Sequence, residues 1–378
     1  MSTATTLQGW VDRKRPYWMV GAGMPFLPLA GYGLVQATGS SLWWWFGPVV
    51  IFIITPILDH IIGSDASNPP ESAVQELEAD PYYRYALYAA IPPLYFNFVW
   101  SAWMLAHGGL DWIGLSGLTA TIGIVSGGVG ISVAHELGHK HALLQRVLAK
   151  LALMPVAYGH FFVEHNRGHH VRVATPEDPA SARYGESFYA FFPRVWIGSI
   201  RSAWELERSR LAKRGHSPWH WQNDNLQAWM GTAVLYGALT AWLGWRVLPF
   251  LIVQAIYGAS LLESVNYVEH YGLLRGKLPD GRYEPCRPEH SWNNNHVVTN
   301  LSLYHLQRHS DHHAHASRAY QALRHFDESP MLPAGYGTMI VLAYLPPLWF
   351  KVMNPIVRTH YGGDMTRVNR QPGRGAER

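Results

Sequence analysis

The chain has 378 residues, of which 48% are hydrophobic and only 15% are charged, with 30 basic and 26 acidic side chains. A single cysteine, Cys286, excludes an internal disulfide framework and any zinc or iron–sulfur site built from cysteines. The basic residues are spread along the chain without a recognition element, so the pI near 9.0 does not indicate nucleic-acid binding.

Six apolar segments are predicted to cross a membrane as helices, because each is about 20 residues long and nearly free of charge. Prolines within several of them are compatible with membrane helices, since neighbouring groups can bond the freed backbone atoms. The expected fold class is therefore an all-α integral membrane protein with six transmembrane helices and a cytoplasmic helical cap. The predicted spans cover approximately residues 17–38, 42–62, 85–106, 112–134, 226–245 and 247–268.

The distribution of lysine and arginine predicts the orientation of these helices. With a cytoplasmic N-terminus, the three short outer loops lie around Gly39, Gly108 and Arg246, and they contain one of the 30 basic residues. The positive-inside rule therefore places both termini in the cytoplasm. Residues 335–353 are also apolar, but a seventh span would place the basic C-terminus outside, so this stretch is expected to be interfacial or re-entrant. No cleavable signal peptide is apparent ahead of the first span.

The polar remainder of the chain is predicted to form the cytoplasmic cap. Along the sequence, two membrane parts alternate with two cytoplasmic parts, and a short tail follows. These parts are residues 1–139 with four spans, 140–225 as a cytoplasmic segment, 226–270 as a helix pair, 271–363 as a second cytoplasmic segment, and 364–378 as a mobile tail.

Histidine is the outlier in the composition, with 21 copies that gather in four places. The first is HELGH (135–139) at the end of the fourth span, where residues i and i+4 share a helix face and can bind one metal ion. The second, EHNRGHH (164–170), repeats the i, i+4 spacing with an adjacent histidine. The third, QRHSDHH (307–313), has the spacing i, i+3, i+4. The fourth is the lone His270, where the sixth span meets the cytoplasm.

The predicted topology brings all four places to the cytoplasmic face, so they can converge on one site. Eight or nine imidazoles exceed the four ligands of a structural zinc site, which implies two metal ions. Imidazole suits zinc, copper, iron and nickel, so the ligands alone do not identify the metal. Carboxylates next to the clusters are expected to orient the ligands. The candidates for this role are Glu136, Glu164, Glu269 and Asp311.

The motifs resemble those of the membrane fatty-acid desaturase/hydroxylase superfamily. More narrowly, HELGHK (135–140), EHNRGHH (164–170), NYVEHYGL (266–273) and LQRHSDHH (306–313) are similar to the bacterial alkane 1-monooxygenase family, and the likeness covers nearly the whole chain. The resemblance implies two non-haem iron ions. Their ligands would be His135, His139, His165, His169, His170, His270, His309, His312 and His313.

The resemblance also implies a reaction and a location. The enzyme would use O2 and electrons from rubredoxin, itself reduced by rubredoxin reductase, to convert the terminal methyl of an alkane into a primary alcohol. It would lie in the bacterial inner membrane with its active site at the cytoplasmic face. One cysteine cannot build an iron site of the rubredoxin type, so the electrons must come from outside the chain. The basic cytoplasmic face would either steer an acidic partner or simply obey the positive-inside rule.

A hydrocarbon substrate dissolved in the bilayer would reach the metals through an apolar channel between the spans. Ile51, about two turns before Asp59 on the second span, is a candidate residue for the wall of this channel, and lipid-facing packing is its alternative role. An alkane has no acidic proton or polar handle, so acid–base or nucleophilic chemistry cannot start the reaction. An oxidant that abstracts a hydrogen atom can.

Three alternative functions stay open on the sequence alone. A fatty-acyl desaturase or hydroxylase, or a hydroxylase of aromatic methyl groups, would keep the site and change the pocket. An intramembrane zinc protease would use the HExxH motif at 135–139, but it needs one metal ion and leaves the other clusters unexplained. A metal carrier would scatter histidines along the spans, whereas here they gather at one face.

Overall fold

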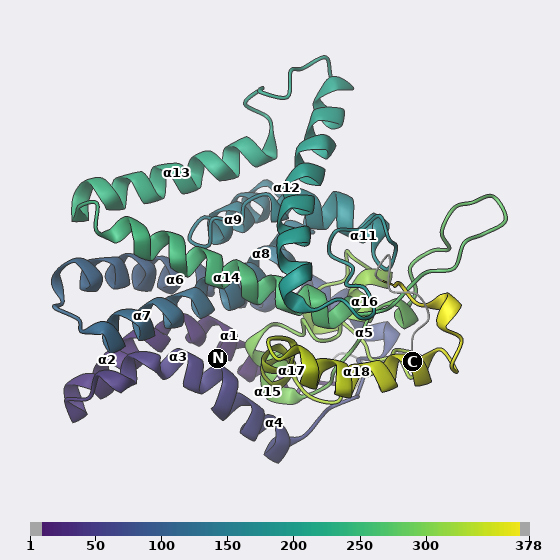
Figure 1. Ribbon diagram of the computed structural model, residues 1–378, viewed down its shortest axis with the longest axis horizontal. Coiled ribbons are helices and arrows are strands. Elements are labelled where there is room, and N and C mark those ends of the chain that lie inside the picture. Colours follow the sequence, from purple (N-terminus) through teal and green to yellow (C-terminus); the bar gives the residue numbers. More distant parts are fainter. Residues whose placement is uncertain (1–9, 371–378) are drawn as a thin grey trace.

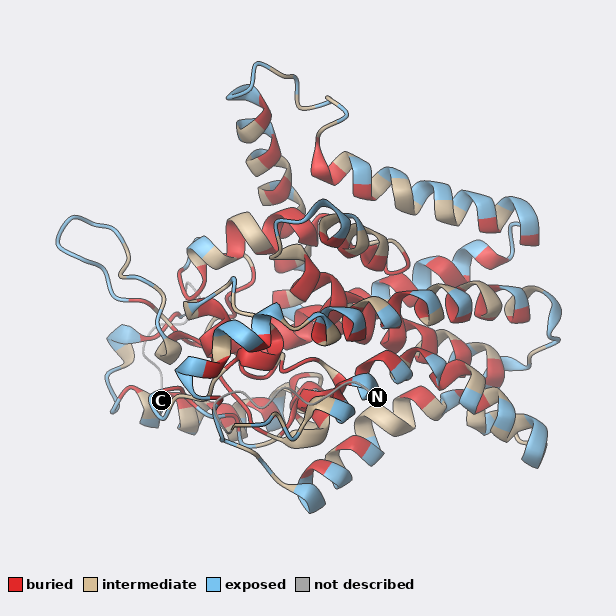
Figure 2. Cartoon of the chain, turned by 180° about the vertical axis from the view of Figure 1, so that it is seen from behind, coloured by how far each residue is buried: buried red, intermediate tan, exposed pale blue. Residues whose placement is uncertain are grey.

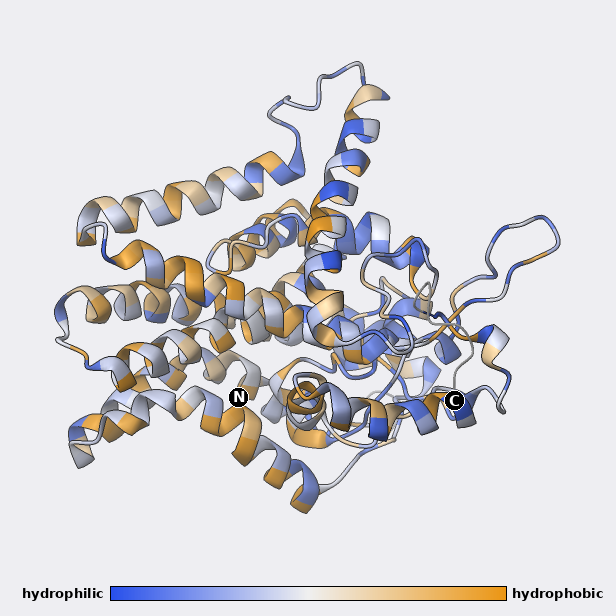
Figure 3. Ribbon diagram, viewed as in Figure 1, coloured by the Kyte–Doolittle hydropathy of each residue, from blue (hydrophilic) through white to orange (hydrophobic). Residues whose placement is uncertain are grey.

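The computed structural model describes residues 10–370, and within this range the secondary structure is helical apart from isolated bridges between single residue pairs. Long helices lie side by side at one end of the molecule, on the left in Figure 1, and short helices with long loops form the other end. Hydrophobic residues dominate the long helices, whereas hydrophilic residues gather at the opposite end (Figure 3). The predicted all-α class is confirmed for the described part of the chain.

Four helical stretches are long and apolar enough to cross a membrane: Arg15–Thr38, Ser41–Ile62, Trp112–Gly138 and Val247–His270. They coincide with four of the predicted spans. The first contains η1 (Arg15–Trp18), α1 (Met19–Gly23), η2 (Met24–Phe26) and α2 (Leu27–Thr38). The second contains η3 (Ser41–Trp45), α3 (Phe46–Val49), the π-helix η4 (Val50–Ile54) and α4 (Thr55–Ile62). The third contains α7 (Trp112–Ile124), the π-helix η5 (Val125–Gly130) and α8 (Ile131–Gly138), and the fourth is α14 (Val247–His270).

The other two predicted spans also form helices, α6 (Pro81–His107) and α13 (Asp224–Leu243), but they do not reach the hydropathy of the first four. A further apolar pair, α17 (Tyr336–Ala343) and α18 (Pro346–His360), is bent by 118° between its two helices. Such a bend is compatible with the interfacial or re-entrant segment predicted there, and equally with one broken span. The structure thus contains four candidate spans, or five if the bent pair is counted as one.

The long helices are joined in pairs by tight turns that lie together at the left end of Figure 1. Each turn contains a glycine with positive φ: Gly39 at 71°, Gly109 at 58° and Gly244 at 88°. Glycine adopts this left-handed conformation without steric cost, so it allows the chain to reverse within a few residues. The turns explain why six helices form three hairpins that point the same way.

The remaining helices form the cap around the histidine clusters. Its last described residues are packed, because Asn369 is buried and its carbonyl accepts a hydrogen bond from the Tyr184 amide. Asn369 of the predicted mobile tail thus packs against the cap, and residues 371–378 lie outside the described range. The cap helices are α5 (Glu71–Ala79), α9 (Leu143–Leu153), α10 (Phe161–Glu164), the π-helix η6 (His165–His169), α11 (His170–Arg172), α12 (Phe188–Ala212), η7 (Pro288–His290), α15 (Val297–Ser302), α16 (His309–Ala314), η8 (Tyr320–Ala322) and η9 (Met365–Arg367).

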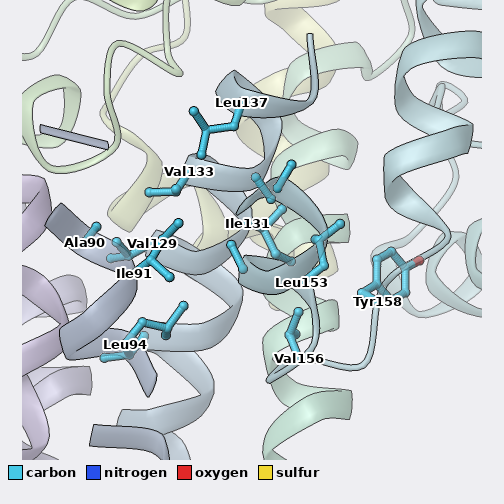
Figure 4. Close-up of a cluster of buried hydrophobic side chains, with 14 of the residues drawn as sticks. Ala90, Ile91, Leu94, Val129, Ile131, Val133, Leu137, Leu153, Val156 and Tyr158 are labelled. Carbon is cyan, nitrogen blue, oxygen red and sulfur yellow. The ribbon is translucent and has the colours of Figure 1, made fainter. Parts of the chain in front are cut away.

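Buried residues concentrate where the long helices meet the cap (Figure 2). One part of this core packs apolar side chains of α6, such as Leu94, against Val129 and Ile131 of the third stretch and Leu153 of α9 (Figure 4). Asp59 at the end of α4 adds a polar anchor, because its buried carboxylate accepts hydrogen bonds from the backbone at the start of α15, including the Thr299 amide at 3.1 Å. These contacts fix the ends of the membrane helices against the cap.

A close glycine contact brings the third and fourth stretches together. A Cβ atom on Gly127 of η5 would lie 2.3 Å from the carbonyl oxygen of Gly258 on α14, so neither position has room for a larger residue. Small residues at such crossings let membrane helices approach closely. The consequence is that His135 on α8 and His270 at the end of α14 reach the same region.

Candidate metal centre

The structure gathers all nine predicted histidines into two adjacent groups. Within each group, every residue offers a ring nitrogen that lies within 4.8 Å of those of the others. The first group contains His135, His139, His165, His170 and His312, and the second contains His169, His270, His309 and His313. The four sequence clusters therefore meet at one place.

The first cluster behaves as its helical spacing predicts. His135 lies in the last turn of α8 and His139 follows at its end, with ring centroids 5.2 Å apart. Both belong to the first group. One α-helical turn thus supplies two neighbouring imidazoles.

The second cluster departs from the expected i, i+4 pairing of His165 with His169, because residues 165–169 form a π-helix. A π-helix closes its turn at i+5 rather than i+4. His165 therefore faces His170, with 3.0 Å between their Nε2 atoms. His169 turns to the second group, where its Nε2 lies 3.2 Å from that of His313.

The third cluster contributes to both groups from one short helix, α16. His309 and His313 are neighbours at 2.8 Å between their Nε2 atoms, as the i, i+4 spacing predicts. His312 points the other way, and its Nε2 lies 3.0 Å from that of His170. His270 completes the second group, with its ring centroid 5.2 Å from that of His309.

The chemical state of these rings fits metal binding. Both ring nitrogens of His135 and of His270 are buried without a hydrogen-bond partner among the described residues. Burial, and then repulsion from neighbouring imidazoles, lowers the pKa of His309, His312 and His313 well below the usual histidine value. Neutral imidazoles present the lone pairs that a metal ion requires. Buried polar atoms without partners are costly, and metal ions between the rings would satisfy them.

Two of the four predicted carboxylates face the histidines. Glu269 lies closest, with Oε2 at 3.0 Å from Nε2 of His309, and it also accepts a hydrogen bond from the Tyr336 hydroxyl. Glu136 is more distant, with 3.7 Å between its Oε1 and Nδ1 of His135.

The other two carboxylates organise the surrounding chain instead. Glu164 accepts a hydrogen bond from Arg172 at 2.7 Å. Asp311 accepts bonds from Arg318 at 2.9 Å and from His315 at 2.8 Å. Neither carboxylate has a hydrogen bond to one of the nine histidines among the described residues. All four carboxylates are immediate neighbours of a predicted ligand in the sequence, so adjacency alone did not indicate which of them meet the rings.

Sequence reasoning missed Asp178, which holds His169. The Oδ2 atom of this buried carboxylate lies 2.9 Å from Nδ1 of His169 and accepts a bond from the Ser181 hydroxyl at 2.7 Å. Burial would raise the pKa of Asp178, but the interactions with His169 and Ser181 bring it down to about 2. The carboxylate is therefore ionised and sets the orientation of the ring. Its only signal in the sequence is an acidic loop, PEDP (176–179), just after the second cluster.

An apolar cavity extends from the histidines between the membrane helices. Its lining includes His135, His165 and His309, and its walls come from all four candidate spans and from α17. Ile51 lies on this wall, beside Phe52 of the same π-helix. The position and the apolar lining of the cavity suit an apolar chain that approaches the histidine groups.

An open groove reaches the histidines from another direction. His139 lies in this groove and is only half-buried, unlike most of the cluster. The groove is strongly basic and contains one acidic residue, Asp224. Its basic residues are Lys140, Arg146, Lys150, Arg167, Arg210 and Arg214.

Comparison with known proteins places the chain in a family. Residues 110–343 match the family model described as fatty acid desaturase. The chain is 46% identical over 370 residues to alkane 1-monooxygenase of Acinetobacter baylyi, an alignment that covers 97% of this chain and 90% of that protein. It is 46% identical to alkane 1-monooxygenase 1 of Alcanivorax borkumensis, with coverages of 97% and 90%. The chain belongs to the alkane 1-monooxygenase family.

The resemblance seen in the sequence motifs is therefore confirmed over nearly the full length. A further member, from Pseudomonas putida, is 44% identical over 97% of this chain and 91% of its own length. As a member of the alkane 1-monooxygenase family, the chain is an oxidoreductase and a multi-pass membrane protein. The histidine groups and the family together indicate metal binding.

Proposed function

We propose that this chain is a di-iron monooxygenase that hydroxylates the terminal methyl of alkanes to 1-alkanols, with O2 as oxidant and rubredoxin as electron donor. The observation that carries the proposal is the apolar cavity whose lining includes His135, His165 and His309. A cavity of this kind suits a substrate without polar groups, and its histidines lie where the chain end would stop. The family membership gives the same substrate class, since the relatives are named alkane 1-monooxygenases.

The nine histidines would hold two iron ions, one in each group. Bound there, the irons would supply the reductive activation of O2 that attack on an unactivated C–H bond requires. The protein residues prepare the site around them. Asp178 fixes the ring of His169 from its Nδ1 side, while Glu269, supported by Tyr336, adds negative charge next to His309. Such outer partners orient imidazole ligands and raise their basicity.

The walls of the cavity would determine which carbon reacts. Apolar side chains exclude water from the cavity, and they give a linear hydrocarbon no polar group by which to bind in another direction. A narrow apolar channel therefore presents a chain end to the histidine groups. Ile51 would act on this wall as one of the residues that the hydrocarbon contacts.

We further propose six spans, with both termini and the site at the cytoplasmic face of the bacterial inner membrane. The support is that the three hairpin turns lie together at one end of the molecule. The predicted outer loops at this end contain a single basic residue, Arg246. α6 and α13 would be the two less apolar spans. Tyrosine and tryptophan, which are frequent in α6, suit membrane interfaces although they lower the hydropathy.

Rubredoxin, reduced in turn by rubredoxin reductase, would dock over the basic groove beside His139. Six basic residues line this groove, and rubredoxins are usually acidic, so opposite charges would steer the encounter. The half-buried ring of His139 would bring the electron donor as near to the metals as the surface allows. The positive-inside rule explains a basic cytoplasmic face in general, but not this concentration next to a histidine group.

The test is to incubate the purified, iron-loaded protein with octane, O2 and a reduced rubredoxin system and to measure 1-octanol. We expect 1-octanol as the product. Its absence with intact iron content would contradict the proposal. Formation of an alkene would favour a desaturase, preferred oxidation of p-xylene would favour an aromatic-methyl hydroxylase, and one zinc ion without iron would favour a protease.

A further inference from the structure

A small cavity, lined mostly by polar residues and with space for about one water molecule, adjoins the apolar one. Its polar lining includes Tyr158, His160, Ser199 and Glu263, which come from α12, α14 and the segment just before α10 (Figure 1). Phe161, His165 and Asn266 line both cavities. These three side chains therefore form the wall between a polar compartment and the proposed hydrocarbon site.

Glu263 is the unexplained group in this compartment. It lies within the α14 span, is 1% exposed, and has neutral hydrogen-bond donors. The Tyr158 hydroxyl donates to its Oε1 at 2.7 Å, and the Asn266 amide donates to its Oε2 at 2.9 Å. An ionisable side chain inside a membrane helix is costly and is kept where it serves a function. The proposed metal site does not use Glu263 as a ligand.

The polar compartment offers hydrogen-bond partners for one water molecule. His160 Nε2 and Glu164 Oε2 are buried without a hydrogen-bond partner, and both residues line the compartment. Buried polar atoms in such a cavity are where ordered water binds. Arg172 closes the compartment on its outer side, where it donates hydrogen bonds to Glu164 at 2.7 Å and to the Ser202 hydroxyl at 2.6 Å. The same side chain lines an open depression of the surface. The Arg172 side chain thus lies between the compartment and solvent.

The proposed reaction needs protons as well as electrons. Its balance is RH + O2 + 2 e⁻ + 2 H⁺ → ROH + H2O: the C–H bond gains one oxygen atom, and the other oxygen leaves as water with the two protons. The electrons come from rubredoxin. The apolar walls of the hydrocarbon cavity cannot deliver the protons, so the protons must arrive by a polar route. The open groove at His139 is one such route, and the polar compartment at Glu263 is a second.

Resting on the proposed function, we propose that Glu263 relays protons from cytoplasmic water, through the polar cavity and past Asn266, to the oxygen chemistry at the histidine groups. Glu263 gives its proton to water in the cavity and takes another from the solvent side, so it is unchanged after each turnover. It acts through water and does not contact the substrate. The other titratable groups that face the same compartment are Tyr158, His160, Glu164, His165 and His169.

The activity test compares three variants. Glu263→Gln keeps the size of the side chain and an acceptor for Tyr158 but cannot carry a proton; we expect octane turnover to fall about 100-fold. Its iron content and octane binding should stay normal, and its solvent deuterium isotope effect should rise. Glu263→Asp should recover most of the rate. Ser264→Ala, a buried change on the next residue of the same helix, is the control and should match the unaltered protein.

Two results of the activity test would overturn the relay. One is full turnover in Glu263→Gln; the other is a loss of iron or octane binding in both Glu263 variants, which would make the role structural. An independent readout uses the iron-free protein: the infrared band of the Glu263 carboxyl, identified by its loss in Glu263→Gln, should shift when H2O is replaced by D2O. A band that does not exchange also overturns the relay. This spectrum is decisive even if the unaltered enzyme forms no 1-octanol, an outcome that would contradict only the proposed function.

Discussion

At the scale of single residues, several of the candidate metal ligands are distinguished by buried ring nitrogens that have no hydrogen-bond partner in the described part of the chain. His270 shows this most clearly, because it is fully buried and neither of its ring nitrogens has a hydrogen-bond partner among the described residues. By contrast, Asp178 is satisfied by His169 and Ser181, and Asp311 by Arg318. Burial without partners marks a ring that needs a metal ion, whereas burial with partners marks a residue that positions others.

The first prediction follows from this contrast. Replacement of His270 by alanine should lower the iron content as severely as His139→Ala, because each removes one imidazole from a group that has no substitute. Iron per chain, measured by elemental analysis of the purified variants, checks this. His60→Ala is the control, because His60 is exposed on α4 and belongs to neither group. A His270→Ala protein with full iron content and activity would remove this residue from the ligand set.

At the scale of elements, departures from the regular α-helix position the site. The π-helix η6 separates His165 from His169 and assigns them to different groups. The π-helix η5 places Gly127 against α14, and η4 places Ile51 on the cavity wall. Single-turn π-helices are rare and are found frequently at functional sites. Here each of them changes the direction of residues that the α-helical period would have sent elsewhere.

The second prediction concerns the η5 contact. Gly127→Ala should lower the thermal unfolding temperature, because the added Cβ would lie 2.3 Å from the Gly258 carbonyl oxygen and overpacking typically costs about 1–3 kcal/mol. Gly128→Ala is a matched control from the same π-helix, since a Cβ there meets nothing within 4 Å. Equal unfolding temperatures of the two variants in detergent would show that the crossing is not tightly packed.

At the scale of the whole molecule, the same histidine groups are approached by two chemically different routes. The apolar cavity reaches them from between the membrane helices, and the basic groove reaches His139 from the polar side. Under the proposed function, separate routes would let a hydrocarbon and an electron-donating protein act on one centre without competing for space. This arrangement depends on the three hairpins turning at the far end, which leaves the polar end free for the cap (Figure 1).

The third prediction tests the groove as the docking surface. Reversal of charge at Lys140 and Arg214 should raise the KM for reduced rubredoxin and weaken its salt dependence, while kcat at saturating donor stays the same, because steering charges act on the encounter. Steady-state rates over a range of salt concentrations measure both effects. Lys277→Glu, an exposed change outside the groove, is the control. An equal response in the control variant would show that only the overall charge matters.

The sequence by itself determined the composition of the centre. Span length, the asymmetry of basic residues and the spacing of the clusters are local properties, so they predicted membrane helices and nine histidines at one face, and the motifs predicted the family. Only the tertiary structure decided how these histidines divide between two groups, that Asp178 rather than Asp311 meets a ring, and that a polar cavity lies beside Glu263. The reason is physical: helical periodicity fixes the direction of side chains along one element, whereas contacts between elements depend on π-helical turns and close glycine crossings that shift this direction.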